Sequence, residues 1–288
     1  MAGLSPMLTT LRRRWLLFVL LAAALFGGCS SLDTQQRKWI FMASALHAAD
    51  LPQRGDGLED VWIEHDSAET GQRVRLHALW FEHEAPEAPV LLYLHGARRN
   101  VEGSVWRIEQ MRDLGFSVLA IDYRGFGRST DELPSEPVVV EDARAAWAWL
   151  AQRHPARPRF IFGHSLGGAI AVQLASDVND ARGLLLESTF TSIPEVFQTM
   201  KWGWLPITPF ITQRFDSASR IARVKAPVLV VHGSRDSLIR PALGRALYER
   251  AQSPKRFVLV EGGTHGSTNR MARAQYREAL KELFGLGS

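Results

Sequence analysis

Short apolar runs recur at regular spacing along most of the chain, separated by polar or glycine-rich stretches. The later runs are continuous and rich in valine, leucine and isoleucine, which is typical of strands buried on both faces of a sheet. The expected strands cover residues 61–64, 74–81, 90–94, 117–121, 159–163, 183–187, 228–231 and 257–260. Apolar positions at helical spacing predict helices over residues 138–153, 168–176, 240–251 and 269–284.

Strands that alternate with helices predict a mostly parallel sheet with helices on both faces. The first two runs have no helix between them and are expected to form an antiparallel hairpin at one edge of the sheet. The chain has 288 residues, of which 46% are hydrophobic and 22% charged, as is typical of a globular protein. We therefore predict an α/β fold with a central sheet of about eight strands.

The first 28 residues differ from the rest in pattern and charge. Arg12, Arg13 and Arg14 precede an apolar run of twelve residues, 15–26, and the single cysteine, Cys29, follows soon after. A helix that spans a bilayer needs about 20 residues, so this run fits the apolar region of a signal peptide. We predict a signal peptide over residues 1–28, a tether and N-terminal segment over 29–56, and one domain over 57–288.

The position of Cys29 resembles the lipoprotein signal of bacteria, in which the cysteine is lipidated and becomes the mature N-terminus. This resemblance implies a protein of the bacterial cell envelope that a lipid at Cys29 holds on a membrane. Ser30 and Ser31 stand where lipoproteins of the inner membrane tend to carry aspartate, which leaves an outer-membrane location open. An ordinary secretory peptide and an uncleaved anchor are the alternatives.

Charge and motif content narrow the classes of function. The formal net charge of the chain is +4, and the three arginines of the predicted signal peptide account for three of these charges. The remaining residues have a net charge of only +1, so we expect no nucleic-acid partner. The chain has no HExxH motif, cysteine pair or P-loop ending that would indicate a metal or a bound phosphate. We expect neither a metal nor a cofactor, and nothing indicates an obligate protein partner.

The ends of the expected strands carry the candidate chemistry, and such ends meet along one edge of a parallel sheet. Gly163-His164-Ser165-Leu166-Gly167 follows a strand and precedes a helix, which is the context that G-x-S-x-G requires. We predict that Ser165 is a nucleophile raised above the sheet. The alternative is that it caps the following helix, because serine is a favoured N-cap.

A serine nucleophile needs a general base, and the base needs an acid that orients it. His265 lies among glycines after the last expected strand, and Asp236 follows the strand before it. We predict that Ser165, Asp236 and His265 form a triad, since the serine, acid and base follow one another in a known chain order. Glu187, at the end of strand 183–187, is the alternative acid.

The negative charge that develops on the substrate needs hydrogen-bond donors, an oxyanion hole. One candidate is the backbone N–H of Leu166, next to the nucleophile. The other is the N–H of Ala97, in the loop "HGARRN" after strand 90–94. Arg98 and Arg99 in that loop are expected either to meet an anionic head group of the substrate or to lie solvated on the surface.

From about residue 37 to residue 284 the chain resembles α/β-hydrolases of the serine-hydrolase branch. The resemblance rests on "HG" with a later asparagine in "HGARRN", and on "DYRGFGRS", "GHSLGG" and "HGSRD". The chain is similar to compact, membrane-associated esterases, thioesterases and monoacylglycerol-lipase-like members. The resemblance implies the α/β-hydrolase fold and the triad, but it does not define the substrate, because one fold serves many chemistries.

The segment 190–216 follows the sixth expected strand, where such enzymes insert the residues that determine specificity. It is apolar and contains Trp202, Trp204 and Phe210, which we predict to contact the substrate. The segment would then be a small lid over a pocket for acyl groups. The alternative is that it simply packs over the sheet.

These observations predict a lipid-anchored serine hydrolase that cleaves a carboxylic ester or thioester of an apolar acyl group through an acyl-enzyme intermediate. Two other functions remain open. One is a serine peptidase or amidase with the same triad. The other is a non-catalytic binding protein of the envelope that retains the fold.

Overall fold

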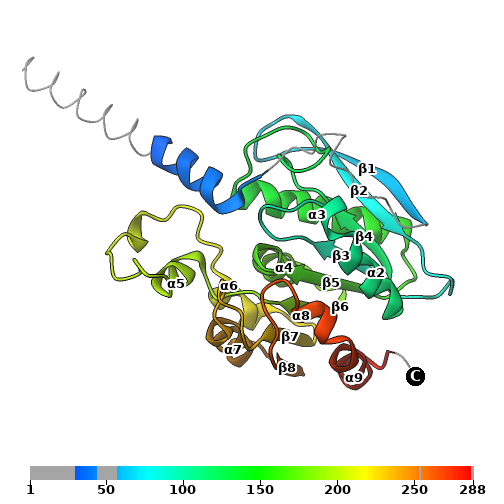
Figure 1. The fold of residues 1–288 in the computed structure, drawn as a ribbon. Helices are drawn as coiled ribbons and strands as arrows, with labels where there is room; N and C mark the ends of the chain where they lie inside the picture. The colour runs from blue at the N-terminus through cyan, green and yellow to red at the C-terminus, as the bar shows by residue number, and fades with distance from the viewer. Residues whose placement is uncertain (1–29, 44–56, 253, 287–288) are drawn as a thin grey trace, which may run out of the picture.

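A single eight-stranded sheet runs through the centre of the computed structural model, which describes residues 30–43, 57–252 and 254–286 (Figure 1). The strands are β1 (Leu58–Asp66), β2 (Arg73–Phe81), β3 (Val90–Leu94), β4 (Ser117–Ile121), β5 (Arg159–His164), β6 (Ala181–Glu187), β7 (Val228–Gly233) and β8 (Lys255–Val260). Their order in the sheet is β1-β2-β4-β3-β5-β6-β7-β8.

Strand directions confirm the predicted architecture. β1 and β2 form an antiparallel hairpin at one edge, and β2 also pairs antiparallel with β4. All other pairs, from β4 and β3 through to β7 and β8, are parallel. The carboxyl ends of six parallel strands therefore meet at one edge of the sheet, where the candidate chemistry lies.

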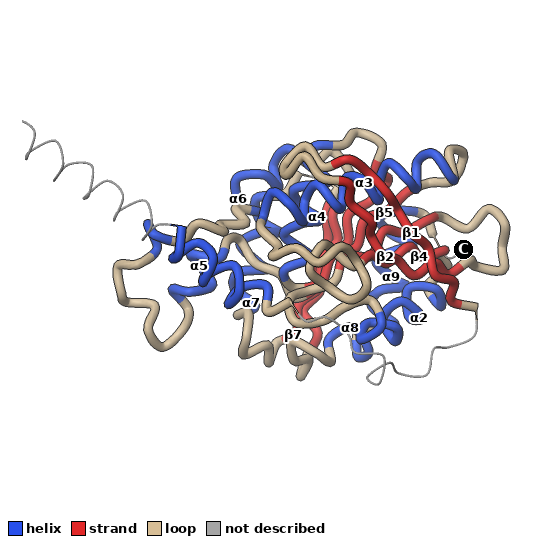
Figure 2. Tube along the Cα trace, turned by 90° about the horizontal axis from the view of Figure 1, so that it is seen from above, coloured by secondary structure: helices blue, strands red, loops and turns tan. Residues whose placement is uncertain are grey.

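Helices cover both faces of the sheet, as the tube in Figure 2 shows. They are α2 (Val105–Asp113), α3 (Glu136–Arg153), α4 (Leu166–Asp177), α5 (Ile193–Gln198), α6 (Ser217–Arg220), α7 (Pro241–Arg250), α8 (Thr268–Met271) and α9 (Arg273–Phe284). Side chains alternate across the sheet, so Leu92 belongs to the core cluster that includes residues of α3, α4 and α7, whereas Leu91 and Tyr93 belong to the cluster that includes residues of α2 and α9.

Two helical segments differ from the prediction. Helix α2 was not predicted, because its buried residues include Arg107 and Gln110 and it therefore lacks a purely apolar stripe. The helix expected over residues 269–284 is two helices, α8 and α9, which meet at Ala272. Both differences lie on elements close to the candidate site.

Residues 30–41, part of the predicted tether, form a helix whose last residue packs into the core. Phe41 is 1% exposed and makes edge-on contacts with the rings of Phe126 and Phe215. The predicted signal peptide, Cys29 and residues 44–56 lie outside the described residues. Among the helices that are described, none has both the length and the apolar character needed to cross a membrane.

Candidate active site

Ser165 occupies a sharp turn between strand β5 and helix α4. Its φ of 56° and ψ of −122° are unusual for a residue with a side chain. Its backbone N–H donates to the carbonyl oxygen of Glu187 at 2.9 Å, and its side chain makes no capping hydrogen bond to α4. Ser165 therefore stands at the N-cap position of α4, but its side chain does not cap the helix and points to another use.

Gly163 and Gly167 permit this turn because a side chain at either position would collide with backbone. A Cβ on Gly167 would lie 2.2 Å from the carbonyl oxygen of Leu94, and one on Gly163 would lie 2.3 Å from that of Gly167. The spacing of the motif thus has a steric cause. The glycines let strand, turn and helix approach closely enough to place Ser165 at the end of the sheet.

Ser165, His265 and Asp236 lie in one chain of hydrogen bonds at the carboxyl ends of β5, β8 and β7. Nε2 of His265 is 3.0 Å from Oγ of Ser165, and Nδ1 of His265 is 2.8 Å from Oδ2 of Asp236. The His265 side chain is 20% exposed, so a substrate can reach it, whereas Asp236 is buried. This geometry allows the imidazole to take a proton from the hydroxyl while the carboxylate orients the ring.

Backbone donors hold the Asp236 carboxylate in place. Its Oδ1 accepts from the N–H groups of Leu238 and Ile239 at 3.0 and 2.9 Å. Burial alone would raise the pKa of Asp236, but hydrogen bonds from His232 and His265 outweigh it, so this pKa lies well below its ordinary value. Asp236 is therefore an anion that faces the His265 ring.

Glu187, the alternative acid, belongs to a separate buried network beneath the site. Its carboxylate accepts hydrogen bonds from Tyr276 at 2.7 Å and Asn269 at 2.9 Å, and it pairs with Arg107 at 3.4 Å. The structure pairs His265 with Asp236 and not with Glu187. The sequence analysis missed Arg107 because it lies on the unpredicted helix α2.

This buried network reaches the site through His164. Nε2 of His164 lies 3.1 Å from Nη2 of Arg107 and 3.1 Å from the backbone oxygen of His265. Burial, followed by the charges of Arg107 and His265, holds the pKa of His164 well below its ordinary value. His164 is thus a neutral ring that contacts the backbone of the candidate base.

The two candidate oxyanion donors face the same region. Ala97 and Leu166 both line the pocket that contains Ser165 and His265. In the described part of the chain, the Ala97 N–H has no hydrogen-bond partner. Leu166 is the first residue of α4, a position whose N–H has no partner within the helix. Both groups are therefore available to a ligand.

A pocket of about 830 Å³ extends from Ser165 and His265, and most of its walls are apolar. This volume is within the range of sites that bind small molecules. Helix 30–41 forms one wall and the insert 190–216 forms another. The lining apolar residues on these two segments are Leu32, Trp39, Ile40, Phe190, Ile193, Val196, Phe197, Met200, Ile207, Phe210 and Ile211.

The predicted substrate contacts divide into two groups. Phe210 and Arg98 line the pocket. Trp202 and Trp204 are not among the lining residues, so their contact with a substrate stays a prediction. They lie on an exposed turn, where 57% and 72% of their surfaces remain accessible, because the chain folds outward between Met200 and Ile207.

The sequence analysis also missed the contribution of helix 30–41 to the pocket. Gln36 joins this helix to the insert, because its Nε2 donates to the carbonyl oxygen of Phe210 at 2.8 Å and its Oε1 accepts from the N–H of Thr212 at 3.0 Å. The available signal was the spacing of Leu32, Gln36 and Ile40, which places them on one face of a helix.

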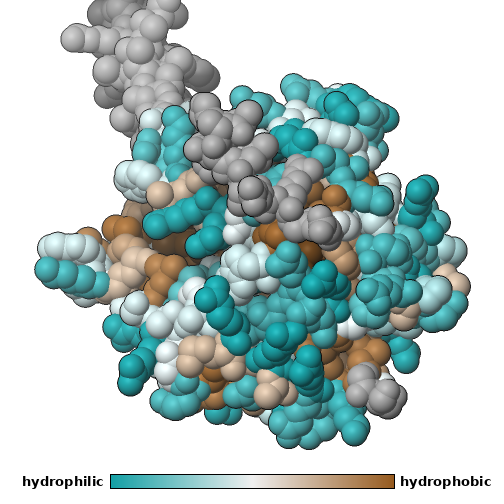
Figure 3. Space-filling view, turned by 45° about the vertical axis from the view of Figure 1, so that its right-hand side comes forward, coloured by the Kyte–Doolittle hydropathy of each residue, from teal (hydrophilic) through white to brown (hydrophobic). Residues whose placement is uncertain are grey.

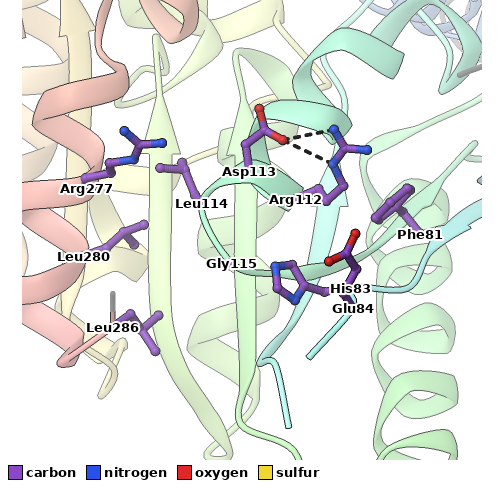
Figure 4. Close-up of a pocket in the computed structure, with 10 residues that line it drawn as sticks. All are labelled: Phe81, His83, Glu84, Arg112, Asp113, Leu114, Gly115, Arg277, Leu280 and Leu286. Atoms are coloured by element: carbon purple, nitrogen blue, oxygen red, sulfur yellow. Dashed lines mark hydrogen bonds and ion pairs between the residues drawn. The ribbon is translucent and has the colours of Figure 1, made fainter. Parts of the chain in front are cut away.

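A second pocket, of about 570 Å³, lies away from this site and is drawn in Figure 4. Its lining residue His83 donates a backbone N–H to Oγ of Ser117 at 2.9 Å, where β4 begins, so this pocket lies toward the amino ends of the parallel strands and away from the candidate site. Its Arg112 and Asp113 bond to each other, as the dashed lines show, and Asp113 also binds Arg273. The charged residues of its lining, Glu84, Arg112, Asp113 and Arg277, balance in sign, and no described hydroxyl or thiol nucleophile lines this pocket.

Two clusters of described side chains have ligand atoms close enough for a metal ion. In the first, His65 lies near Glu141 and Asp142, but Arg124 already bonds to both carboxylates. The second consists of Asp60, His77 and Glu102, where Arg128 pairs with Asp60. A guanidinium already occupies the cationic position in each cluster, so neither is well suited to a metal.

The fold and the site together define an α/β-hydrolase. The sequence profile of the family Hydrolase_4, described as serine aminopeptidase, S33, matches residues 85–218 and 209–269. These segments span more than half of the chain, and the chain belongs to this family.

Individual relatives agree with this assignment. An uncharacterized protein of Mycobacterium tuberculosis is 36% identical over 235 residues, which are 81% of each chain. The lysophosphatidylserine lipase ABHD12 of Danio rerio is 33% identical over 186 residues, 58% of this chain and 48% of the relative. A solved structure, esterase Pf2001 of Pyrococcus furiosus, has a TM-score of 0.63 at 20% identity and covers 81% of this chain and 98% of its own. The protein is thus a hydrolase of the α/β fold.

Proposed function

We propose that the protein is a serine hydrolase that cleaves carboxylic esters or thioesters of apolar acyl groups. The observation that carries the proposal is the hydrogen-bond chain from Ser165 through His265 to Asp236, which lies in the wall of a largely apolar pocket. The nucleophile, the base and the place for an acyl group are thereby adjacent.

In the first half of the reaction, Oγ of Ser165 attacks the acyl carbonyl while Nε2 of His265 takes its proton. The intermediate then expels the alcohol or thiol, which receives that proton from His265. In the second half, His265 activates a water that attacks the acyl-enzyme and releases the acid and the free serine. Asp236 keeps the Nδ1–H tautomer of the ring throughout.

The negative charge on the carbonyl oxygen is stabilised by the backbone N–H groups of Leu166 and Ala97. Each donor contributes about 3–4 kcal/mol to such a transition state. Loop 95–100 and the turn at Ser165 are close together, since a Cβ on Gly96 would lie 3.0 Å from the Cβ of Ser165. This proximity supports the assignment of one donor to each segment.

The residues that line the pocket favour a substrate that has an apolar acyl chain and an anionic group near its polar end. Phe210 and its apolar neighbours surround the chain, while Arg98, Arg99 and Arg107 line the same pocket. The relative named lysophosphatidylserine lipase supports a substrate with both features. The insert 190–216 then serves as the lid, together with helix 30–41.

A peptidase or amidase is the second candidate, because the family is described as serine aminopeptidase. An aminopeptidase must hold a free ammonium group, but no described Asp or Glu lines this pocket. This difference favours esters. Turnover of an acyl ester and of the matching acyl amide by the same preparation would distinguish the two functions.

For its location, we propose the bacterial cell envelope, where a lipid on Cys29 anchors the chain to a membrane. Both the inner and the outer membrane are compatible with this proposal. The lipoprotein-like sequence before Ser30 supports this location. Metabolic labelling with a radioactive fatty acid should mark the wild-type chain, and Cys29→Ser should remain unlabelled. Labelling of Cys29→Ser at the wild-type level would refute the anchor.

The proposed reaction is tested with the full chain in detergent, a fluorophosphonate label and p-nitrophenyl butyrate. Ser165→Ala should remove labelling and reduce turnover by about 10⁶-fold. Ser176→Ala, which alters a serine near the other end of helix α4 whose hydroxyl bonds only within that segment, is the matched control and should retain both signals. A folded wild-type chain that neither labels nor turns over esters would refute the enzyme and favour a binding protein.

A further inference from the structure

Exposed apolar side chains are concentrated around the mouth of the active-site pocket. Of eleven large hydrophobic residues that are exposed in the described chain, nine lie on helix 30–41, the two residues after it, the insert 190–216 or the loop of Asp236. These nine form what we call the mouth patch: Leu32, Trp39, Met42, Met200, Trp202, Trp204, Ile207, Phe210 and Leu238. Figure 3 shows brown residues gathered around a hollow on the left of the face drawn.

Trp202 and Trp204 extend this patch beyond the pocket. Met200 and Ile207 line the pocket, and the turn that joins them carries the two tryptophans outward. Short hydrogen-bonded turns hold the segment, including one from the N–H of Leu205 to the carbonyl oxygen of Trp202 at 3.0 Å. Two indole rings are therefore presented to the surroundings beside the pocket mouth, a position that intramolecular packing does not require.

The charge pattern of the insert fits the head-group region of a bilayer. Between Glu195 and Arg214, the only charged side chain is Lys201. Its Nζ lies 5.5 Å from the centre of the Trp202 ring. Tryptophan favours the membrane–water interface and a lysine ammonium is attracted to anionic lipids, so this pair suits that surface.

The shape of the patch also restricts its occupant. Seven of its nine residues line the pocket as well, so the pocket opens through the patch. A protein partner seated there would close the entrance to the active site. A bilayer can cover the same surface and at the same time supply an apolar ester.

The position of the patch along the chain agrees with this occupant. Leu32 is three residues from Cys29, and the apolar run 15–26 precedes both in the sequence. In the location proposed above, the membrane that holds the chain at Cys29 lies within a few residues of the patch, and this step rests on that proposal. Docking of the patch then adds a second contact to the first, which is how stable membrane binding arises.

We propose that the mouth patch docks on a lipid bilayer, so that acyl esters pass from the membrane directly into the pocket. The route of the substrate rests on the proposed function, whereas the contact between patch and bilayer does not. The turn of Trp202 and Trp204 is the part that enters the interface. Helix 30–41 and Phe210 then face the lipid from the two sides of the pocket.

The kinetic test uses the full chain in vesicles of phosphatidylcholine and phosphatidylglycerol. Trp202→Ser/Trp204→Ser should lower turnover of a long-chain ester embedded in the vesicles by about tenfold, because two buried indoles are lost from the interface. Turnover of water-soluble p-nitrophenyl butyrate should remain unchanged. Leu259→Ser, which alters an exposed apolar residue outside the patch, is the matched control and should change neither rate.

A physical test needs no turnover. Vesicles with brominated acyl chains should quench tryptophan emission of Ser165→Ala, and Ser165→Ala/Trp202→Phe/Trp204→Phe should lose part of that quenching. Unchanged quenching would refute the docking, as would a wild-type chain that is dimeric in light scattering and becomes monomeric in the double serine variant. If no variant hydrolyses either ester, the proposed function fails, and the quenching experiment still decides the docking.

Discussion

Ser165, Asp236 and His265 lie on turns that leave strands of the central sheet, whereas helix 30–41 and the insert 190–216 cover the pocket without joining any strand. Backbone groups fix the first region, as when two N–H groups bind Asp236. A few side chains such as Gln36 fix the second. The catalytic residues are thus fixed by the sheet. The residues that select the substrate lie on helix 30–41 and the insert 190–216, together called the cover, which can change in sequence without altering the sheet.

The largest expected effect lies in the sheet-borne region. Asp236→Asn should lower turnover by about 10⁴-fold for short and long esters alike, because His265 loses the partner that fixes its tautomer. The measurement is kcat/KM over a series of acyl chain lengths. Asp216→Asn, in the insert, is the control and should stay near the wild-type rate. A loss confined to long esters would contradict the division between the two regions.

A change in the cover should act on long substrates only. Phe210→Ala should reduce kcat/KM for a long-chain ester by about tenfold, since roughly 1.4 kcal/mol of apolar contact is removed. The rate with p-nitrophenyl acetate should not change. Equal losses for both substrates would show that the cover and the catalytic residues are coupled.

The attachment between the two parts of the cover is open to a direct test. Gln36→Ala removes two hydrogen bonds between helix 30–41 and the insert, which together are worth about 1–3 kcal/mol. Hydrogen exchange of residues 30–43 should become faster, while exchange in β5 and β7 stays slow. Gln35→Ala, on an exposed position of the same helix, is the matched control.

The smallest expected effect is the pH dependence of stability. Burial, followed by the charges of Arg107 and His265, lowers the pKa of His164 in the folded chain. Above about pH 6.5, the ordinary value, His164 is neutral in both the folded and the unfolded chain and does not reduce stability. Below that pH, the unfolded chain binds a proton that the folded chain does not, and stability falls. Asp236, whose pKa is lowered, loses its contribution only below about pH 3.8, outside this window.

Lowering the pH from 7 to 5 should therefore shift the Tm of the wild-type chain further in the destabilising direction than the Tm of His164→Asn. Asp142, whose pKa burial raises to about 7, stabilises the folded state in the same window and is present in both proteins, so the difference between the two slopes reports on His164. Some slope should remain, because burial also lowers the pKa of His95. Identical slopes in both proteins would contradict a buried neutral His164.

The sheet and the catalytic constellation were predictable because their signals are local. Continuous apolar runs define buried strands, and the steric needs of the turn at Ser165 impose the glycines of the motif. The order of Ser165, Asp236 and His265 then follows from the strands that each residue succeeds. Similar local constraints made the antiparallel hairpin of β1 and β2 predictable.

The cover was less predictable because contacts between segments that are far apart in the sequence determine where its residues lie. Trp202 resembles a pocket residue in the sequence, and only the outward course of the turn separates it from Phe210. Helix 30–41 gave a weak signal, since Asp33 and Gln36 use polar side chains to bind the insert. Helix α2 was missed for the same reason, with Arg107 buried against Glu187.

The end of helix 30–41 also bears on where the hydrolase can be cut. The carbonyl oxygen of Phe41 accepts the backbone N–H of Arg98 at 3.0 Å, and Arg98 holds a left-handed conformation, with a φ of 68°, next to Ala97. A recombinant fragment that starts at residue 57 would lose the Phe41 ring from the core and this hold on the loop of Ala97. The shortest useful expression fragment therefore begins at residue 30, even though the sheet begins at Leu58.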